Sequence, residues 1–126
     1  MEPSLAKILA ILIILPVIVL SGVFLRRASR PYNKLLFTLH KTAAVVAVIF
    51  SVIVIRLFII NSVAAGILVY LLYLTAFLIL AGFISGALQS FERPPPAFVN
   101  IIHKVSSYLM MVFIPLTFLL LFKIQT

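Results

Sequence analysis

The chain has 126 residues, of which 65% are hydrophobic and 10% are charged, and its formal net charge is +8. Soluble domains are about 45–50% apolar and about 25% charged, so a soluble core of this length could not bury so much apolar surface. The chain contains no cysteine, which excludes disulfides and cysteine-bound iron–sulfur clusters.

Four apolar runs follow one another along the chain: Leu5–Leu25, Leu35–Ile60, Val63–Leu88 and Ala97–Phe122. Each reaches the roughly 20 residues needed to cross a hydrocarbon core of about 30 Å, and runs of this length satisfy their backbone groups as helices. The opening MEPSLAK has no basic leader, so the first run is predicted to be a mature helix and not a signal peptide. We therefore predict an all-α membrane protein of a single domain, residues 1–126, folded as a four-transmembrane-helix up-and-down bundle.

The placement of the basic residues indicates topology and not nucleic-acid binding. Seven basic residues cluster around the first and third inter-helix connections: Arg26, Arg27, Arg30, Lys34, Lys41, Arg93 and Lys104. The other end of the bundle has only Lys7, Arg56 and Lys123. The positive-inside rule then predicts that connections 1–2 and 3–4 are cytoplasmic and that both termini lie outside, in a cytoplasmic (inner) membrane, with anionic lipid as a possible contact.

Two stretches of the chain resemble each other. Segment 21–44 and segment 85–107 both contain Ser-Gly, then Arg-Pro, then eight residues before His-Lys, and then two small residues. The offset is 63 from Arg30 to Arg93 and from His40 to His103, and 64 for the Ser-Gly pair. Five features in register favour a duplicated helical hairpin, with repeat one at about 5–60 and repeat two at about 64–123.

The two histidines are the only histidines in the chain, and the repeat gives them equal depth. The second helix is predicted to start near Pro31 or Asn33 and the fourth near Pro96, which puts each histidine roughly 10 Å into its helix. Helices two and four stand diagonally across a four-helix bundle, so the two imidazoles are predicted to face each other. Small side chains are expected around them, and the volume they leave suggests a ligand: Gly22, Ala43, Ala44 and Ala47 beside His40, and Gly86, Ser106 and Ser107 beside His103.

A structural interpretation of the same pattern is also open. Glycine, alanine and serine let membrane helices approach closely, and each histidine could simply form a hydrogen bond to a neighbouring helix. Ionisable groups inside a membrane are nevertheless functional candidates by default, because they are costly to place there. Two symmetry-matched histidines favour the functional interpretation.

Haem b is the cofactor that fits these residues best. Two histidines without nearby Cys, Asp or Glu make a poor zinc site, but they are the complete axial set of one non-covalent, six-coordinate haem. Covalent c-type attachment is excluded because cysteine is absent. The porphyrin is expected to contact Phe37, Ala44, Ala47, Ser107 and Met110. Its propionates are expected to pair with Lys41, Lys104 and Lys34, whose side chains lean toward the basic side. Asn100 is expected either to bond a propionate, to orient a ligand, or to serve the backbone at the helix end.

On these His-Lys pairs and their surroundings, the chain resembles membrane b-type cytochromes built as four-helix bundles. Cytochrome b561-type proteins and the haem-bearing anchor subunits of respiratory enzymes are of this kind. Cytochrome b561-type proteins carry two pairs of histidines, whereas this chain has one. The expected function is one-electron transfer near the cytoplasmic face, to or from quinone or a partner redox protein. The chain is expected to act as a subunit of an oxidoreductase complex, or as a homo-oligomer, and not as a stand-alone enzyme.

The competing interpretation is a cofactor-free membrane scaffold or assembly subunit whose repeat serves helix packing. Four-helix multidrug transporters depend on an intramembrane glutamate, and here the two acids, Glu2 and Glu92, lie outside the apolar runs. No nucleophile–base–acid set supports hydrolytic chemistry. Arg56, near the far end of the second helix, is expected to extend outward to the interface, with a quinone pocket or a subunit contact as alternatives.

Overall fold

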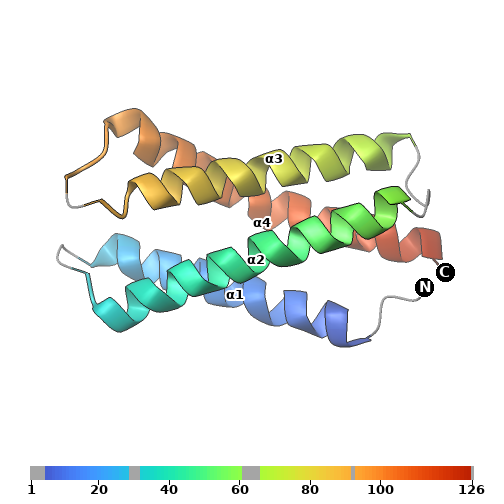
Figure 1. Ribbon diagram of the computed structural model, residues 1–126, viewed down its shortest axis with the longest axis horizontal. Coiled ribbons are helices and arrows are strands. Elements are labelled where there is room, and N and C mark those ends of the chain that lie inside the picture. Colours follow the sequence, from blue (N-terminus) through green and yellow to red (C-terminus); the bar gives the residue numbers. More distant parts are fainter. Residues whose placement is uncertain (1–4, 29–31, 61–65, 92, 126) are drawn as a thin grey trace. The chain divides into compact units, whose positions relative to one another are not determined.

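The computed structural model describes residues 5–28, 32–60, 66–91 and 93–125. Within these ranges the chain is helical and contains no strand, which confirms the predicted all-α class (Figure 1). The helices are α1 (Leu5–Arg27), α2 (Lys34–Ile60), α3 (Ile67–Leu88) and α4 (Ala97–Gln125). The sequence predictions that involve Glu2, Arg30, Pro31, Val63 and Glu92 fall outside the described residues.

Local chemistry explains where the helices begin. The Oδ1 atom of Asn33 accepts hydrogen bonds from the backbone N–H groups of Leu35 and Leu36 at 2.9 and 3.3 Å, which is an N-cap for α2. Pro96 immediately precedes α4, as the sequence predicts. Gly66 precedes α3 with a φ of 60°, a conformation that glycine adopts without steric cost. This turn sets the start of α3 at Ile67.

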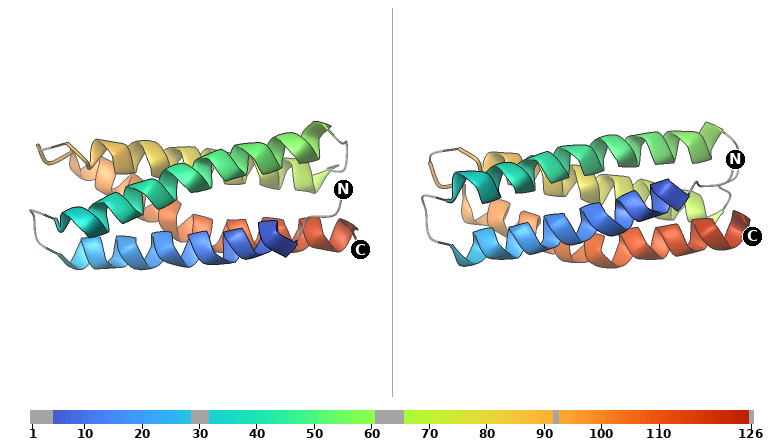
Figure 2. Two further views of the ribbon diagram at one scale, coloured as in Figure 1. Left: turned by 60° about the horizontal axis from the view of Figure 1, so that its bottom comes forward. Right: turned by 90° about the horizontal axis from the view of Figure 1, so that it is seen from below.

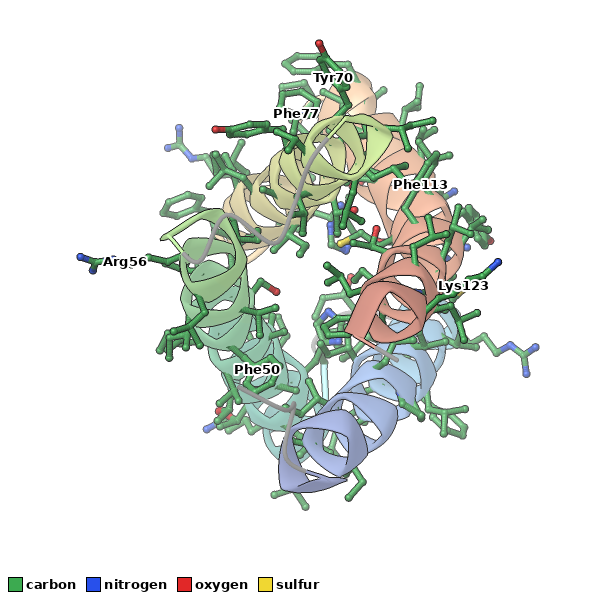
Figure 3. All side chains as sticks on the ribbon, turned by 90° about the vertical axis from the view of Figure 1, so that its right-hand side faces the viewer. Phe50, Arg56, Tyr70, Phe77, Phe113 and Lys123 are labelled. Atoms are coloured by element: carbon green, nitrogen blue, oxygen red, sulfur yellow. The ribbon has the colours of Figure 1, made fainter. Side chains whose placement is uncertain are left out.

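Three helices are long and apolar enough to cross a membrane, among the residues that the structure describes. These spans are Lys34–Leu57, Ile67–Leu88 and Ala97–Leu121, with mean hydropathies of 2.1, 2.6 and 1.8. Much of their apolar surface faces outward: Tyr70 and Phe77 project from α3 with 76% and 66% of their surface exposed (Figure 3). A lipid environment would cover these side chains, so the structure indicates an integral membrane protein.

The chain forms two compact units, residues 1–49 and 50–126, and the boundary lies inside α2. The first unit contains α1 and the N-terminal part of α2, which run antiparallel (Figure 2). The second unit contains the rest of α2 together with α3 and α4. The predicted sequence repeat, by contrast, would have its boundary after Ile60.

The second unit is organised by the antiparallel pair α3 and α4 (Figures 1 and 2). One face of α3 is buried with the three- and four-residue spacing of a helix stripe: Leu68, Leu72, Thr75, Leu78, Gly82 and Ser85. Leu68 and Leu72 form a core cluster with Leu121 of α4. Near this cluster, the Thr75 and Thr117 hydroxyls form a hydrogen bond at 3.0 Å between α3 and α4.

Candidate functional site

Each histidine is held by the helix that precedes its own. In the first unit, Nδ1 of His40 on α2 lies 2.9 Å from Oγ of Ser21 and 3.1 Å from the carbonyl oxygen of Ile18, both on α1. Ser21 is buried, and the histidine ring is half-buried. The ring therefore connects α1 and α2 through two polar contacts at a single nitrogen.

The second unit contains the same arrangement. Nδ1 of His103 on α4 lies 3.1 Å from Oγ of Ser85 and 3.1 Å from the carbonyl oxygen of Gly82, both on α3. Ser85 is buried to the same degree as Ser21, with 3% of its surface exposed in each case. In both sites the serine and the carbonyl group are separated by three residues, which puts them on one face of the helix.

A glycine lies against each ring. A Cβ atom built on Gly22 would lie 3.1 Å from Cε1 of His40, and one built on Gly86 would lie 3.0 Å from Cε1 of His103. Both distances are shorter than an ordinary van der Waals contact, so an alanine would push against the imidazole. The sequence predicts that these glycines leave volume for a ligand. In the structure, the histidine ring itself occupies that space.

The hydrogen-bond partners determine which ring nitrogen carries the proton. Carbonyl oxygens only accept, so Nδ1 must donate to the oxygen of Ile18 in one site and of Gly82 in the other. The serine hydroxyls donate to carbonyl groups of their own helices, Ser21 to Val17 and Ser85 to Ala81, which leaves their oxygen lone pairs to accept from Nδ1–H. A neutral imidazole with its proton on Nδ1 carries its ring lone pair on Nε2.

The second site is extended by a methionine. A Cβ atom on Gly82 would lie 2.6 Å from the Sδ-bound methyl carbon, Cε, of Met110 and 3.4 Å from Oγ of Ser106. Met110 is seven residues after His103, on the same face of α4, so its side chain fills the space that Gly82 leaves. The repeat offsets pair Gly82 with Ile18 and Met110 with Ala47. In the second hairpin the small residue is on α3 and the large one on α4. In the first hairpin the large residue is on α1 and the small one on α2.

The predicted porphyrin-contact residues have varied surroundings. Phe37 is half-buried, stacks on Tyr32 with ring centroids 5.8 Å apart, and carries the Lys41 ammonium 4.4 Å above its ring. Ala44 and Ala47 are half-buried on α2. The Ser107 hydroxyl donates to the carbonyl oxygen of His103 at 2.6 Å, so it bonds to its own helix.

The predicted propionate partners are all on the surface. Lys34, Lys41, Lys104 and Asn100 are exposed. Lys34 and Lys41 lie on the N-terminal part of α2, and Asn100 and Lys104 on that of α4, which are the ends that carry the histidines. Arg56 is also exposed, and it extends outward from α2 (Figure 3). This orientation agrees with the expected outward extension of Arg56.

Two residues of the site, Ser21 and Ser85, were not among the sequence-predicted ligand-binding residues. The Ser-Gly pair was part of the repeat, but only its glycines were assigned to the site. The recurrence of Ser-Gly before His-Lys in both halves of the chain is the sequence signal that could have identified these serines. The spacing from serine to histidine differs, at 19 and 18 residues, yet both pairs meet. The one-residue difference in the repeat therefore leaves the contact intact.

The metal-ligand inventory is small. In the described ranges there is no group of three or more His, Cys, Asp or Glu side chains that could hold a metal ion. Structural and catalytic zinc centres generally use three or four protein ligands. A cofactor that brings its own donors needs fewer side chains.

Comparisons of the chain with protein-family models, curated proteins and solved structures returned no match.

Proposed function

We propose that this protein is a membrane b-type cytochrome that binds one non-covalent haem b through His40 and His103. The observation that carries the proposal is the recurrence of one arrangement, serine and carbonyl at Nδ1 and glycine at Cε1, around the only two histidines. In the proposed protein, electrons pass near the cytoplasmic face to or from quinone or a partner redox protein. The chain serves as a subunit of a larger complex.

The state of the two rings supports a ligand role. A histidine that binds a metal through one nitrogen commonly donates its other ring N–H to a backbone carbonyl or another acceptor. His40 and His103 both have this donor arrangement at Nδ1, which leaves Nε2 as the ligating atom. The small donor set also suits haem, because the porphyrin supplies four nitrogens and requires only two axial ligands from the protein.

The proposed architecture has four membrane spans, with Leu5–Leu25 as the first, arranged as two repeated hairpins in an up-and-down bundle. The matched Ser–His contacts in the two hairpins support the duplication. The excess of basic residues around connections 1–2 and 3–4 supports a cytoplasmic position for the histidine-bearing ends, in the inner membrane. Lys34, Lys41 and Lys104 would then meet the propionates at the basic side.

Bound haem supplies one-electron redox chemistry. The residues of the chain would provide the rest of the function. The two imidazoles would hold the haem iron and so keep oxygen from it. The apolar helix surfaces would exclude water and fit against lipid or neighbouring subunits. The exposed lysines would offset the carboxylate charge of the propionates.

A cofactor-free scaffold is the second candidate function, and one observation favours it. Each histidine already forms two hydrogen-bond contacts to the neighbouring helix, and its ring packs on a glycine. Interhelical hydrogen bonds and close packing on small residues are how membrane helices associate without any cofactor. In that case, the same side chains would serve only to hold each hairpin together.

The visible spectrum of the purified protein tests the proposal. Protein from haem-replete cells should show a sharp Soret band and, after reduction, α and β bands. His40→Ala and His103→Ala should each abolish or shift these bands, whereas Thr42→Ala, an exposed position of α2, should leave them unchanged. A folded, colourless protein would support the scaffold instead.

A further inference from the structure

We propose that Ser21 and Ser85 are positioning residues, which hold each imidazole as the Nδ1–H tautomer and so direct the Nε2 lone pair to an axial position of the haem iron. This inference rests on the function proposed above. It gives a role to two buried hydroxyls that are not themselves proposed to bind the haem iron. Both hydroxyls lie on the helix that precedes the histidine, at 2.9 and 3.1 Å from Nδ1.

A buried serine in a membrane helix commonly does no more than bond to the carbonyl groups of its own helix. Ser106 is an example within this chain, because it has 3% of its surface exposed and donates to the carbonyl oxygen of Ile102 at 2.7 Å. Ser85 also has 3% exposed and bonds to its own helix, but its oxygen additionally contacts His103. The contact to the ring is therefore what separates these two serines.

The serine, the carbonyl group and the glycine together fix the orientation of the ring. Rotating the His103 ring by half a turn would bring a C–H group to the place of Nδ1 and would break the contacts to Ser85 and Gly82. Gly86 allows Cε1 to lie close to the α3 backbone, where a Cβ atom would be only 3.0 Å away. Ring rotation is thus opposed by the polar contacts at Nδ1 and by close packing at the adjacent Cε1.

A fixed ring affects both the affinity and the potential of the iron. An N–H donor held by an oxygen increases the basicity of the opposite nitrogen, and losing such a partner costs about 10–100-fold in metal affinity. A more basic axial ligand favours the oxidised iron and lowers the midpoint potential. Removing the serine hydroxyl should weaken haem binding and raise that potential.

The tautomer is tested on the full chain without haem, by ¹⁵N NMR of histidine-labelled protein in lipid nanodiscs. Both rings should carry the proton on Nδ1 and the lone pair on Nε2. Ser85→Ala should change the signals of His103 and leave those of His40 in place, and the matched variant Ser106→Ala should change neither ring's tautomer. A lone pair on Nδ1 in the wild type, or identical His103 signals in wild type and Ser85→Ala, would overturn the positioning role.

The haem-loaded protein supplies the second measurement. Ser85→Ala should bind haem about 10–100-fold more weakly than the wild type and show a higher midpoint potential, whereas Ser51→Ala, on the C-terminal half of α2, should match the wild type in both. Equal affinity and potential for the two variants would overturn the positioning role while the cytochrome function stands. A wild-type protein that binds no haem would overturn the cytochrome function, and with it the proposed role at an iron. The NMR result would then still report the tautomer by itself.

Discussion

Ser85 on α3 and His103 on α4 are joined by a 3.1 Å contact between Oγ and Nδ1. The same contact joins Ser21 on α1 to His40 on α2 at 2.9 Å. In each case a glycine follows the serine and lies against Cε1 of the same ring. The Ser-Gly pair therefore binds the imidazole through two adjacent residues. The serine hydroxyl contacts the ring, and the glycine, which lacks a side chain, lets the ring pack against the helix.

Gly86→Ala should destabilise the second hairpin, because the new methyl group would lie 3.0 Å from Cε1 of His103. The ring is held by two contacts at Nδ1, so it cannot move aside without loss. Overpacking of this kind costs about 1–3 kcal/mol. The free energy of unfolding in detergent or bilayer measures the effect. Ala87→Gly, an exposed change in the same turn, is the control for backbone propensity. A change below about 0.5 kcal/mol for Gly86→Ala would contradict the tight fit.

Gly82→Ala should lower the free energy of unfolding by an amount that depends on Met110. Its Cβ atom would lie 2.6 Å from Cε of Met110, which is the far end of a flexible side chain. Part of the cost should therefore disappear when Met110 is shortened to alanine. A double-mutant cycle on unfolding free energies measures this coupling, which we expect to be about 0.5–3 kcal/mol. Equal costs of Gly82→Ala in both backgrounds would show that the methionine does not limit this position.

Thr75→Val and Thr117→Val should each destabilise the packing of α3 on α4. The two hydroxyls are bonded at 3.0 Å and have 6% and 2% of their surface exposed. Each single change leaves a buried hydroxyl without its partner, and interhelical hydrogen bonds in membranes contribute about 0.6–1.7 kcal/mol. The double variant should lose less than the two single losses together, because it leaves no orphaned group. If the double variant lost as much unfolding free energy as the two single variants together, the hydrogen bond between the two hydroxyls would be ruled out.

Single cysteines should report the membrane orientation. The chain has no cysteine, so the wild type is an unlabelled background. A membrane-impermeant maleimide should label Lys123→Cys in intact cells, whereas Arg27→Cys and Arg93→Cys should react only after the membrane is opened. This pattern follows from the excess of basic residues around the first and third connections. The opposite pattern would place the histidine-bearing ends outside.

Much of the secondary structure could be predicted from the sequence, because hydropathy and the residues that begin and end helices are local features. The predicted start near Asn33 is confirmed by its capping contacts to Leu35 and Leu36, and α4 begins directly after Pro96. The predicted start of the third apolar run, Val63, lies outside the described residues. In the structure α3 begins at Ile67, after Gly66 adopts a positive φ.

The candidate site could be predicted only in part. The repeat identified His40 and His103 together with Gly22 and Gly86, because these residues stand out in an apolar chain. The partners of Nδ1 could not be predicted, since two of them are backbone carbonyl groups, which any residue provides. Which face of α1 or α3 turns toward the histidine depends on helix rotation, and a hydropathy pattern that is apolar all round does not specify it.

The central claim, that both histidines bind one haem, is tested most directly by titrating the purified haem-free protein with haem. Binding should saturate at one haem per chain and give a six-coordinate, low-spin spectrum. In His40→Gly and His103→Gly this spectrum should be lost, and added imidazole should restore it by entering the space of the missing side chain. Failure of the folded wild type to bind haem, or an unchanged spectrum in either glycine variant, would contradict the claim.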